Sequence, residues 1–255
     1  MLNQKLKKNI IKLVKNLGDE VEKIKLSPVK YVLKEDNSPL TIADSFINLE
    51  LNKFISNTKF NNIISEENDE IPFSIRGKWD CFWMIDPIDG TKEFINQSSD
   101  YTLNIAFCKK NIPIFSVVYA PARSELYHAE KNKGAFKNGK IINTAKLKSN
   151  MLNVVASKSH INKPTKSFIK KLQTSRKVNL VQYGSSLKIC KVAEGDADIY
   201  PRFGPTMEWD TCAAQLILEE AGGFLKDIGG KSLNYNKHSL LNNHFLASGH
   251  EDYIL

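Results

Sequence analysis

Long apolar runs are absent from this 255-residue chain. The richest apolar segment, Ile112 to Ala122, is shorter than the roughly 20 residues that a membrane-spanning helix needs, and it contains proline. The first 25 residues alternate lysine with leucine, isoleucine and valine and hold no apolar core of the secretory-signal kind. Internal repeats and low-complexity tracts are also absent. We therefore expect a globular protein of the cytoplasm with no transmembrane segment.

Cysteine is scarce, and its spacing argues against a zinc site or a disulfide framework. The four residues form no CxxC pair and lie far apart, at Cys81, Cys108, Cys190 and Cys212. We expect reduced, structural thiols. The histidines lie outside the segments that carry chemistry, so surface or structural roles are expected for His128, His160, His238, His244 and His250.

Acidic residues are too few to balance the basic ones, because 28 Asp and Glu face 36 Lys and Arg and leave a net charge of +8. A basic surface can serve nucleic acid, a membrane or an anionic small molecule. Lysine is spread along the whole chain, so we interpret the excess as general composition rather than as a binding stripe. No aromatic and basic motif typical of RNA recognition is present. We therefore expect a small-molecule partner and no nucleic acid.

Apolar periodicity predicts a first half of two helices followed by short strands. Steps of three and four residues predict helices at Leu2–Leu26 and Thr41–Ile55, on either side of a turn-prone segment at Lys34–Pro39. The two longest β-rich segments, Tyr101–Cys108 and Ile112–Tyr119, form a predicted hairpin. Shorter strands are expected at Asn62–Ser65, Cys81–Ile85, Leu126–Glu130 and Ala135–Lys137.

Beyond residue 150 the predicted strands and helices alternate. Pro164 fits the first turn of a helix at Lys163–Leu172, and two glycines end a helix at Thr211–Ala221. We therefore expect an α+β domain at residues 1–150 and an α/β domain at 151–255, layered around sheets. The remaining elements expected here are a helix at Ser185–Glu194 and strands at Leu152–Ala156, Val178–Tyr183, Ala197–Tyr200 and Phe245–Ala247.

The strongest chemical signal is the hexapeptide Asp86-Pro87-Ile88-Asp89-Gly90-Thr91, which directly follows an apolar run. Two carboxylates that a proline fixes at the end of a strand supply the hard oxygen ligands that Mg²⁺ prefers. Gly90 allows a ligand to approach the backbone. Thr91 opens a short helical piece at Lys92–Asn96, whose N-terminus can seat a phosphate. The alternative is a plain turn, because Asp and Gly are good turn formers.

Acidic residues at two further element ends weaken that alternative. Ser65-Glu66-Glu67 ends another β-like segment, and Trp209-Asp210 begins a predicted helix. Each has an ordinary alternative role, Glu66 as a solvated loop acid and Asp210 as a helix N-cap. Together with the two aspartates of the hexapeptide, they form an acidic set of the kind that two-metal phosphoryl transfer requires.

In combination, these segments resemble the inositol-monophosphatase-like superfamily, and within it the bacterial 3'(2'),5'-bisphosphate nucleotidases. The resemblance runs nearly end to end and implies the αβαβα sandwich of the sugar phosphatases. The parts around Lys188 and Arg202 point to the nucleotidases. The matching segments are Lys34–Thr41 with Asp44, Ser65–Glu67, Asp86–Phe94, Val117–Pro121, Gly184–Lys188, Val192–Gly195 and Tyr200–Thr211.

The resemblance implies a Mg²⁺-dependent phosphatase with two or three ions in one site. It assigns the first ion to Glu66, Asp86 and the backbone carbonyl of Ile88. It assigns the second to Asp86, Asp89 and Asp210, and a third, looser ion shares Glu66. Inhibition by Li⁺ is implied as well.

Further roles follow from the same resemblance. Thr91 pairs with Asp44 to orient and deprotonate the attacking water, although Asp44 at the start of a helix also has a plain role in charge complementarity. The N–H groups near Gly90 and Thr91 hold the phosphate. The remaining substrate contacts are assigned to Gly184, Ser185, Lys188 and Arg202.

The expected reaction is hydrolysis of the 3'-phosphate of adenosine 3',5'-bisphosphate to give AMP, with 3'-phosphoadenosine 5'-phosphosulfate as a related substrate. An inositol monophosphatase or a sugar bisphosphatase is the nearest alternative, because a fold does not determine its substrate. An inert RNA- or membrane-binding protein is the alternative of another class, and the intact acidic set argues against it. The resemblance leaves open a monomer or a homodimer and peripheral membrane association. One extra acid, Glu208, receives no role beyond a surface charge.

Overall fold

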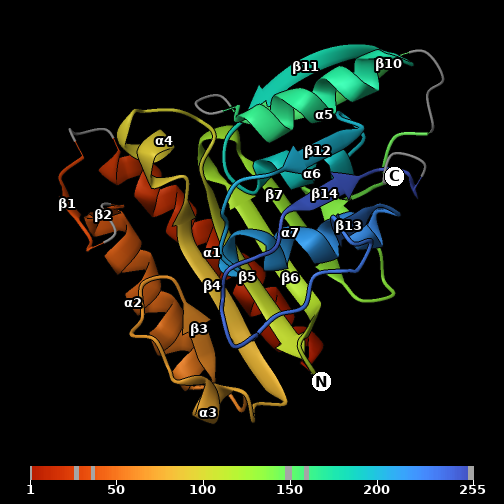
Figure 1. The fold of residues 1–255 in the computed structure, drawn as a ribbon. Coiled ribbons are helices and arrows are strands. Elements are labelled where there is room, and N and C mark those ends of the chain that lie inside the picture. The colour runs from red at the N-terminus through yellow and green to blue at the C-terminus, as the bar shows by residue number, and fades with distance from the viewer. Residues whose placement is uncertain (1, 26–28, 36–37, 147–150, 158–160, 252–255) are drawn as a thin grey trace.

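Two large sheets alternate with three layers of helices in the computed structural model, which describes residues 2–25, 29–35, 38–146, 151–157 and 161–251 (Figure 1). The layers follow from the apolar faces of the sheets, each of which needs a cover.

The first sheet has seven strands in chain order. Its first pair is parallel, and each later neighbour is antiparallel to the one before it. The strands are β3 (Ile63–Ser65), β4 (Cys81–Asp89), β5 (Thr102–Lys109), β6 (Ile112–Ala120), β7 (Glu125–Glu130), β8 (Ala135–Lys137) and β9 (Lys140–Ile142).

Both faces of this sheet are apolar. In β4, Phe82 and Met84 belong to one core cluster, whereas Trp83 and Ile85 belong to another. Because side chains alternate along a strand, these pairs point to opposite faces of the sheet. Burial on both sides explains why β4 reads as a continuous apolar run rather than as an alternating pattern.

Helices α1 (Gln4–Ile24) and α2 (Ile42–Ser56) cover one face of the first sheet (Figure 1). The side chain of Asn3 caps α1 by accepting a hydrogen bond from the Leu6 N–H at 2.8 Å. A two-stranded sheet of β1 (Tyr31–Leu33) and β2 (Pro39–Thr41) lies between the two helices in the chain.

Helices α6 (Leu187–Ala193) and α7 (Trp209–Glu220) form the middle layer, between the two sheets (Figure 1). All of α6 is buried, and so are residues 211–218 of α7. A helix that packs on both sides needs apolar residues all round. This layer joins the first sheet to the second in one core cluster.

The second sheet has five strands in the order β11-β10-β12-β14-β13. Helix α5 (Lys163–Gln173) covers its outer face, where Ile169 packs with Leu152 and Ile199. The succession of layers confirms the predicted αβαβα sandwich. The strands are β10 (Met151–Ser157), β11 (Lys177–Tyr183), β12 (Ile199–Arg202), β13 (Phe224–Asp227) and β14 (Phe245–Ser248).

The predicted strand at Cys81–Ile85 is too short, because β4 continues through Pro87 to Asp89. Its pairing with β5 shifts register between Asp86 and Asp89, so the missing N–H of the proline falls at an irregularity of the ladder. The predicted helical piece begins one residue earlier than expected, as α4 (Thr91–Ile95). The predicted hairpin of β5 and β6 is confirmed.

The sheets change between β9 and β10, near residue 150. Helix α7 belongs to the second half of the chain but packs against β5 and β6 of the first. The two halves therefore share a core, and their division into separate domains stays a prediction. Among the described helices, none combines the length and the apolar character that crossing a bilayer requires. Leu26, Asp36, Asn37 and His160, which the sequence analysis included, lie outside the described residues.

Candidate active site and metal centre

Three carboxylates from three separate elements meet at one end of the first sheet. Glu66 follows β3, Asp86 lies in β4 and Asp210 lies in the first turn of α7. One oxygen from each lies within 4.8 Å of the other two. Parallel pairing brings β3 beside β4, and the packing of α7 against β4 brings in Asp210.

Asp86 is the buried centre of this set. The residue is 1% exposed, and within the described part of the chain neither of its buried carboxylate oxygens has a hydrogen-bond partner. Burial and the neighbouring charges of Glu66, Asp89 and Asp210 raise the pKa of Asp86 well above its usual range. A buried carboxylate with no protein partner is costly, and a cation would satisfy it.

Asp89 lies beside this set and is linked to the start of α6. Its carboxylate accepts a hydrogen bond from the Ser186 N–H. Burial raises the pKa of Asp89 to about 6, while the charge of Lys188 opposes that rise. Lys188 is itself buried, and this burial lowers its pKa to about 8. Asp89 and Lys188 therefore place an acidic and a basic group in the lining of the same cavity.

The other two carboxylates are partly engaged by the protein. Asp210 accepts a hydrogen bond from the Met207 N–H at 2.8 Å, and Glu66 forms an ion pair with Lys34 at 2.9 Å. Burial, followed by the charge of Asp89, raises the pKa of Asp210 well above its usual range.

The donor set fits a hard divalent cation. All the side-chain ligands are carboxylate oxygens, which Mg²⁺ prefers, and two of them on Asp86 have no other partner among the described residues. Mutual repulsion of the buried charges is the cost of assembling the set, and a cation at the centre removes it.

Thr91 and Asp44 are not hydrogen-bonded to each other within the described part of the chain. The Thr91 hydroxyl donates to the Ile88 carbonyl at 3.1 Å. The Asp44 carboxylate accepts from the N–H and the hydroxyl of Thr41, at 2.8 and 2.6 Å, and so completes a capping box at the start of α2. Burial raises the pKa of Asp44 to about 6.

A cavity of about 610 Å³ opens beside the carboxylates. Lys188 and Arg202 line it together, and the charge of Arg202 contributes to the lowered pKa of Lys188. Arg202 donates to the Pro205 carbonyl at 2.7 Å, whereas its buried Nε has no hydrogen-bond partner among the residues that the structure describes. The cavity lining also includes Asp89, Gly90, Ser185 and Asp210, so half of the predicted site residues lie around it.

Two predicted substrate contacts, Thr91 and Gly184, lie outside the cavity lining, and Gly184 is a tightly packed turn residue. A Cβ at Gly184 would lie 2.6 Å from the Asp100 carbonyl oxygen. It positions Ser185 and Ser186 by its close approach to Asp100.

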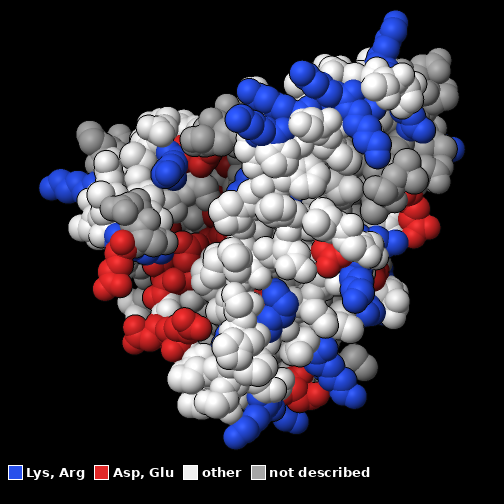
Figure 2. All heavy atoms as spheres, viewed as in Figure 1, with Lys and Arg blue, Asp and Glu red and all other residues white. Residues whose placement is uncertain are grey.

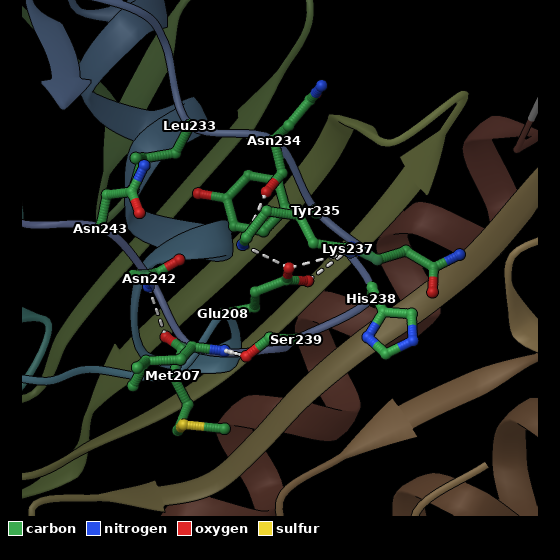
Figure 3. A network of polar contacts seen from close by, with 12 residues as sticks. Met207, Glu208, Leu233, Asn234, Tyr235, Lys237, His238, Ser239, Asn242 and Asn243 are labelled. Atoms are coloured by element: carbon green, nitrogen blue, oxygen red, sulfur yellow. Dashed lines mark hydrogen bonds and ion pairs between the residues drawn. The ribbon is translucent and has the colours of Figure 1, made fainter. Parts of the chain in front are cut away.

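Glu208 is not the surface charge that the sequence analysis expected, because its residue is 0% exposed. Its carboxylate accepts hydrogen bonds from the N–H groups of Asn236 and Lys237 and from the Lys237 ammonium group (Figure 3). The partners lie almost 30 residues further along the chain, so no local pattern indicates them. The one available signal was that Glu208 is an acidic residue close to the candidate ligand Asp210.

Basic side chains gather on one part of the surface. Figure 2 shows Lys and Arg concentrated over α5, where Lys163, Lys166, Lys170 and Lys171 are exposed. The expected even spread of lysine therefore does not hold on this face. Asn162 and Thr165, at the start of α5, line the cavity, so the basic surface adjoins the site.

Comparison with known proteins identifies the family of this chain. A model of the inositol monophosphatase family matches residues 2–254. Two curated relatives named 3'(2'),5'-bisphosphate nucleotidase CysQ are each 35% identical. The relative from Salmonella typhimurium aligns over 91% of this chain and 95% of its own, and the one from Escherichia coli K12 over 94% and 98%.

Solved structures agree with the layered fold. CysQ from Bacteroides thetaiotaomicron, described as a bacterial member of the inositol monophosphatase family, has a TM-score of 0.83 at 36% identity, over 92% of this chain and 94% of that one. An IMPase/NADP phosphatase complexed with Mg²⁺ and phosphate has a TM-score of 0.82 at 22% identity, over 98% and 94%. At 22% identity the second likeness concerns the fold alone. The chain described here belongs to the inositol monophosphatase family.

Proposed function

We propose that this chain is a Mg²⁺-dependent 3'(2'),5'-bisphosphate nucleotidase that hydrolyses adenosine 3',5'-bisphosphate to AMP and phosphate. The observation that carries the proposal is the unpartnered carboxylate of Asp86, which adjoins a cavity holding the two cations Lys188 and Arg202. The names of the relatives at 35% identity support the substrate. The sulfated nucleotide 3'-phosphoadenosine 5'-phosphosulfate is proposed as a second substrate.

The proposed ligands are those of the acidic set. Glu66, Asp86 and the Ile88 carbonyl would hold one Mg²⁺, and Asp86, Asp89 and Asp210 a second, with a third at Glu66. Bound ions in such a set neutralise the phosphoryl oxygens, lower the pKa of a water and stabilise the leaving oxygen. The Thr91 hydroxyl and the Asp44 carboxylate would orient and deprotonate the attacking water, and N–H groups near Gly90 and Thr91 would hold the phosphate.

Lys188 and Arg202 would select the nucleotide. An Arg guanidinium can form a forked contact with a second phosphate or lie against an adenine ring, whereas it has no acceptor for a sugar hydroxyl. Two buried or half-buried cations in one cavity favour a dianionic second group over a neutral ring. Gly184 and Ser185 would shape the cavity wall beside them.

A phosphate-release panel tests the proposal. Purified protein is assayed with Mg²⁺ on adenosine 3',5'-bisphosphate, 3'-phosphoadenosine 5'-phosphosulfate, inositol 1-phosphate and fructose 1,6-bisphosphate. Asp210→Asn is the matched inactive control, and LiCl against KCl at equal ionic strength tests lithium sensitivity. We expect the two nucleotides to be preferred by at least about tenfold in kcat/KM, which corresponds to one good charge-assisted contact. Preference for inositol 1-phosphate or fructose 1,6-bisphosphate would overturn the substrate assignment. The cytoplasmic location and the oligomeric state stay predictions.

A further inference from the structure

Glu208 is a fully buried carboxylate that immediately precedes α7. Its side chain holds the N–H groups of Asn236 and Lys237, and its own N–H donates to the Leu240 carbonyl at 2.8 Å (Figure 3). One residue therefore fastens the start of α7, which carries Asp210, to the segment 236–240.

Arg76 holds the same segment from its other side. It ends α3 (Phe73–Arg76) and is 1% exposed. Its guanidinium donates to the carbonyls of Lys237 at 2.6 Å and His238 at 2.9 Å. Asn236 accepts from the guanidinium at 2.8 Å and returns a hydrogen bond to the Arg76 carbonyl at 2.7 Å. Glu208 thus binds the N–H groups of this segment, and Arg76 binds its carbonyls.

The two buried charges are neutralised through the segment between them rather than by each other. The carboxylate nearest to Arg76 belongs to Glu70, which lies 3.9 Å away and is 75% exposed. The Glu208 carboxylate has the Lys237 ammonium group as its ionic partner. Burying charges costs free energy that hydrogen bonds must recover, and removing Glu208 or Arg76 leaves the backbone groups that it binds without those hydrogen bonds. We call Glu208, Arg76 and residues 236–238 the Glu208–Arg76 clamp.

The clamp links two segments that carry candidate metal ligands. Arg76 also donates to the Ile71 carbonyl at 3.0 Å, and thereby holds the loop that follows Glu66. Glu208 lies two residues before Asp210. The clamp therefore reaches from one ligand-bearing loop to the start of the other ligand-bearing element.

Direct packing does not fill the space between these two segments. A cavity of about 330 Å³ lies there, lined by Glu66 and Ile71 on one side and by Met207 and Trp209 on the other, with Arg76 at its wall. Close packing normally fixes the distance between neighbouring segments of a protein interior. Where a cavity lies between two segments, other contacts must fix that distance. Both segments also pack against β4, and the hydrogen bonds of the clamp add a second connection across the cavity.

We propose that Glu208 and Arg76 are positioning residues that fix the separation of Glu66 and Asp210 and so set the affinity of the site for a divalent cation. The proposal rests on the metal site of the proposed function. Neither residue is a ligand itself, because the Glu208 carboxylate is satisfied by three donors and Arg76 is a cation. Groups that hydrogen-bond a metal ligand directly typically change metal affinity by about 10- to 100-fold when they are replaced. Glu208 and Arg76 act one step further out, so the lower end of that range is expected for them.

The test measures Mg²⁺ and Mn²⁺ binding to metal-free protein by titration calorimetry, independently of activity. Glu208→Gln keeps the shape of the side chain but replaces one carboxylate oxygen with an NH₂ group, which cannot accept a hydrogen bond from Asn236 or Lys237. Arg76→Lys keeps the charge but loses the forked contacts. For each variant we expect the metal Kd to rise about tenfold or more. At saturating Mg²⁺, kcat should stay within about threefold of the wild type, since the ligands remain.

Glu219→Gln is the matched control, because Glu219 is a half-buried acid on the same helix that bonds Gln215. It should leave the metal Kd unchanged. If Glu208→Gln yields no folded protein, Lys237→Met removes one donor from the same carboxylate and takes its place, with the same expected direction. Lower thermal stability with an unchanged Kd in the clamp variants would overturn the proposal. Failure of the wild type to bind either metal would refute the proposed function instead.

Discussion

Asp86 shows how a candidate active-site residue can oppose folding. Its charge lies among three other carboxylates, and no described group donates a hydrogen bond to it. Because its pKa is raised in the folded state, the metal-free fold holds a proton there more tightly than the unfolded chain does. The stability from this group is therefore present at low pH and is lost as the pH rises through the folded pKa.

Replacing Asp86 with asparagine should stabilise the metal-free protein, because the substitution removes the buried charge. In EDTA, we expect the Tm of Asp86→Asn to exceed that of the wild type, by a difference that grows as the pH rises. The gain in Tm on adding Mg²⁺ should disappear in the variant. Thermal melts across a pH series, with and without Mg²⁺, measure both effects. If the wild type has a higher Tm than Asp86→Asn in EDTA at pH 8, the buried charge of Asp86 does not destabilise the fold.

Thr91 and Asp44 have separate hydrogen bonds in the metal-free structure, so their proposed partnership needs a kinetic test. If the two act as one unit on the water, Thr91→Ala and Asp44→Asn should each lower kcat by orders of magnitude, and the double variant should lose little more. Thr41→Ala is the control, because it opens the capping box at a cost of about 1 kcal/mol while Asp44 remains. Additive losses would leave Asp44 with its capping role alone.

Arg202 is expected to distinguish nucleotides from simpler phosphates. Arg202→Glu should lower kcat/KM for adenosine 3',5'-bisphosphate by at least about tenfold, because a charge-assisted contact is worth about 1.5–3 kcal/mol. Hydrolysis of a small monophosphate should change much less. The matched control is Lys140→Glu, the same charge reversal at an exposed position of β9. Equal losses on both substrates would mean that Arg202 supports the fold or the metal site.

For single residues, the sequence predicted which acidic residues form the candidate site, but it did not predict their hydrogen-bond partners. Asp86 and Asp89 share a short motif whose chemistry is local, so the sequence alone indicates it. Glu208 gains its role from Asn236 and Lys237, and no periodicity connects residues that far apart. The bond of Asp44 to Thr41 is local, because Thr41-Ile42-Ala43-Asp44 fits the capping-box pattern, and the sequence analysis missed it.

Among the elements, the long and periodic ones follow most directly from the sequence. The helix predicted at Leu2–Leu26 is α1, at Gln4–Ile24, and its apolar stripe decides its burial. The short strands β1, β2, β9 and β13 were not predicted, nor was the single-turn helix α3. Strands of three or four residues show few alternations, so only some of them, such as β3 and β8, were predicted from the sequence. β13 exists because it pairs with β14, a neighbour about 20 residues away in the chain.

The turn between β11 and α6 should tolerate no side chain at Gly184. A Cβ there would meet the carbonyl oxygen and the Cβ of the buried Asp100 at 2.6 and 2.8 Å, so the turn must move. Because the turn carries the Ser186 contact to Asp89, Gly184→Ala should lower kcat/KM by at least about tenfold; shifts near 1 Å can cost far more. Gly204→Ala, whose Cβ would meet nothing closer than 3.8 Å, should be almost neutral. Comparable kinetics for the two variants would refute this packing argument.

For the molecule as a whole, the basic face over α5 should attract anionic substrates (Figure 2). Replacing Lys163, Lys166 and Lys170 with glutamine should lower kcat/KM severalfold at low salt and leave kcat unchanged. The difference should fade at 1 M salt, where the Debye length is about 3 Å. Steady-state kinetics across a salt series provide the measurement. The same change at three exposed lysines of α1, on the far side of the first sheet, is the control: Lys5, Lys8 and Lys12. Equal effects of the two triple variants would exclude local steering.

The shared core also has a consequence for the nascent chain. The first sheet is complete at Ile142, but α6 and α7, which cover one of its apolar faces, come later in the chain, and α7 ends at Glu220. At roughly 5–20 residues per second, synthesis of the intervening segment takes about 4 to 16 seconds. Throughout that interval, a ribosome-bound chain presents an uncovered apolar sheet to its surroundings. Translation speed between these two points, and the chaperones present at the tunnel exit, should therefore affect the yield of native protein.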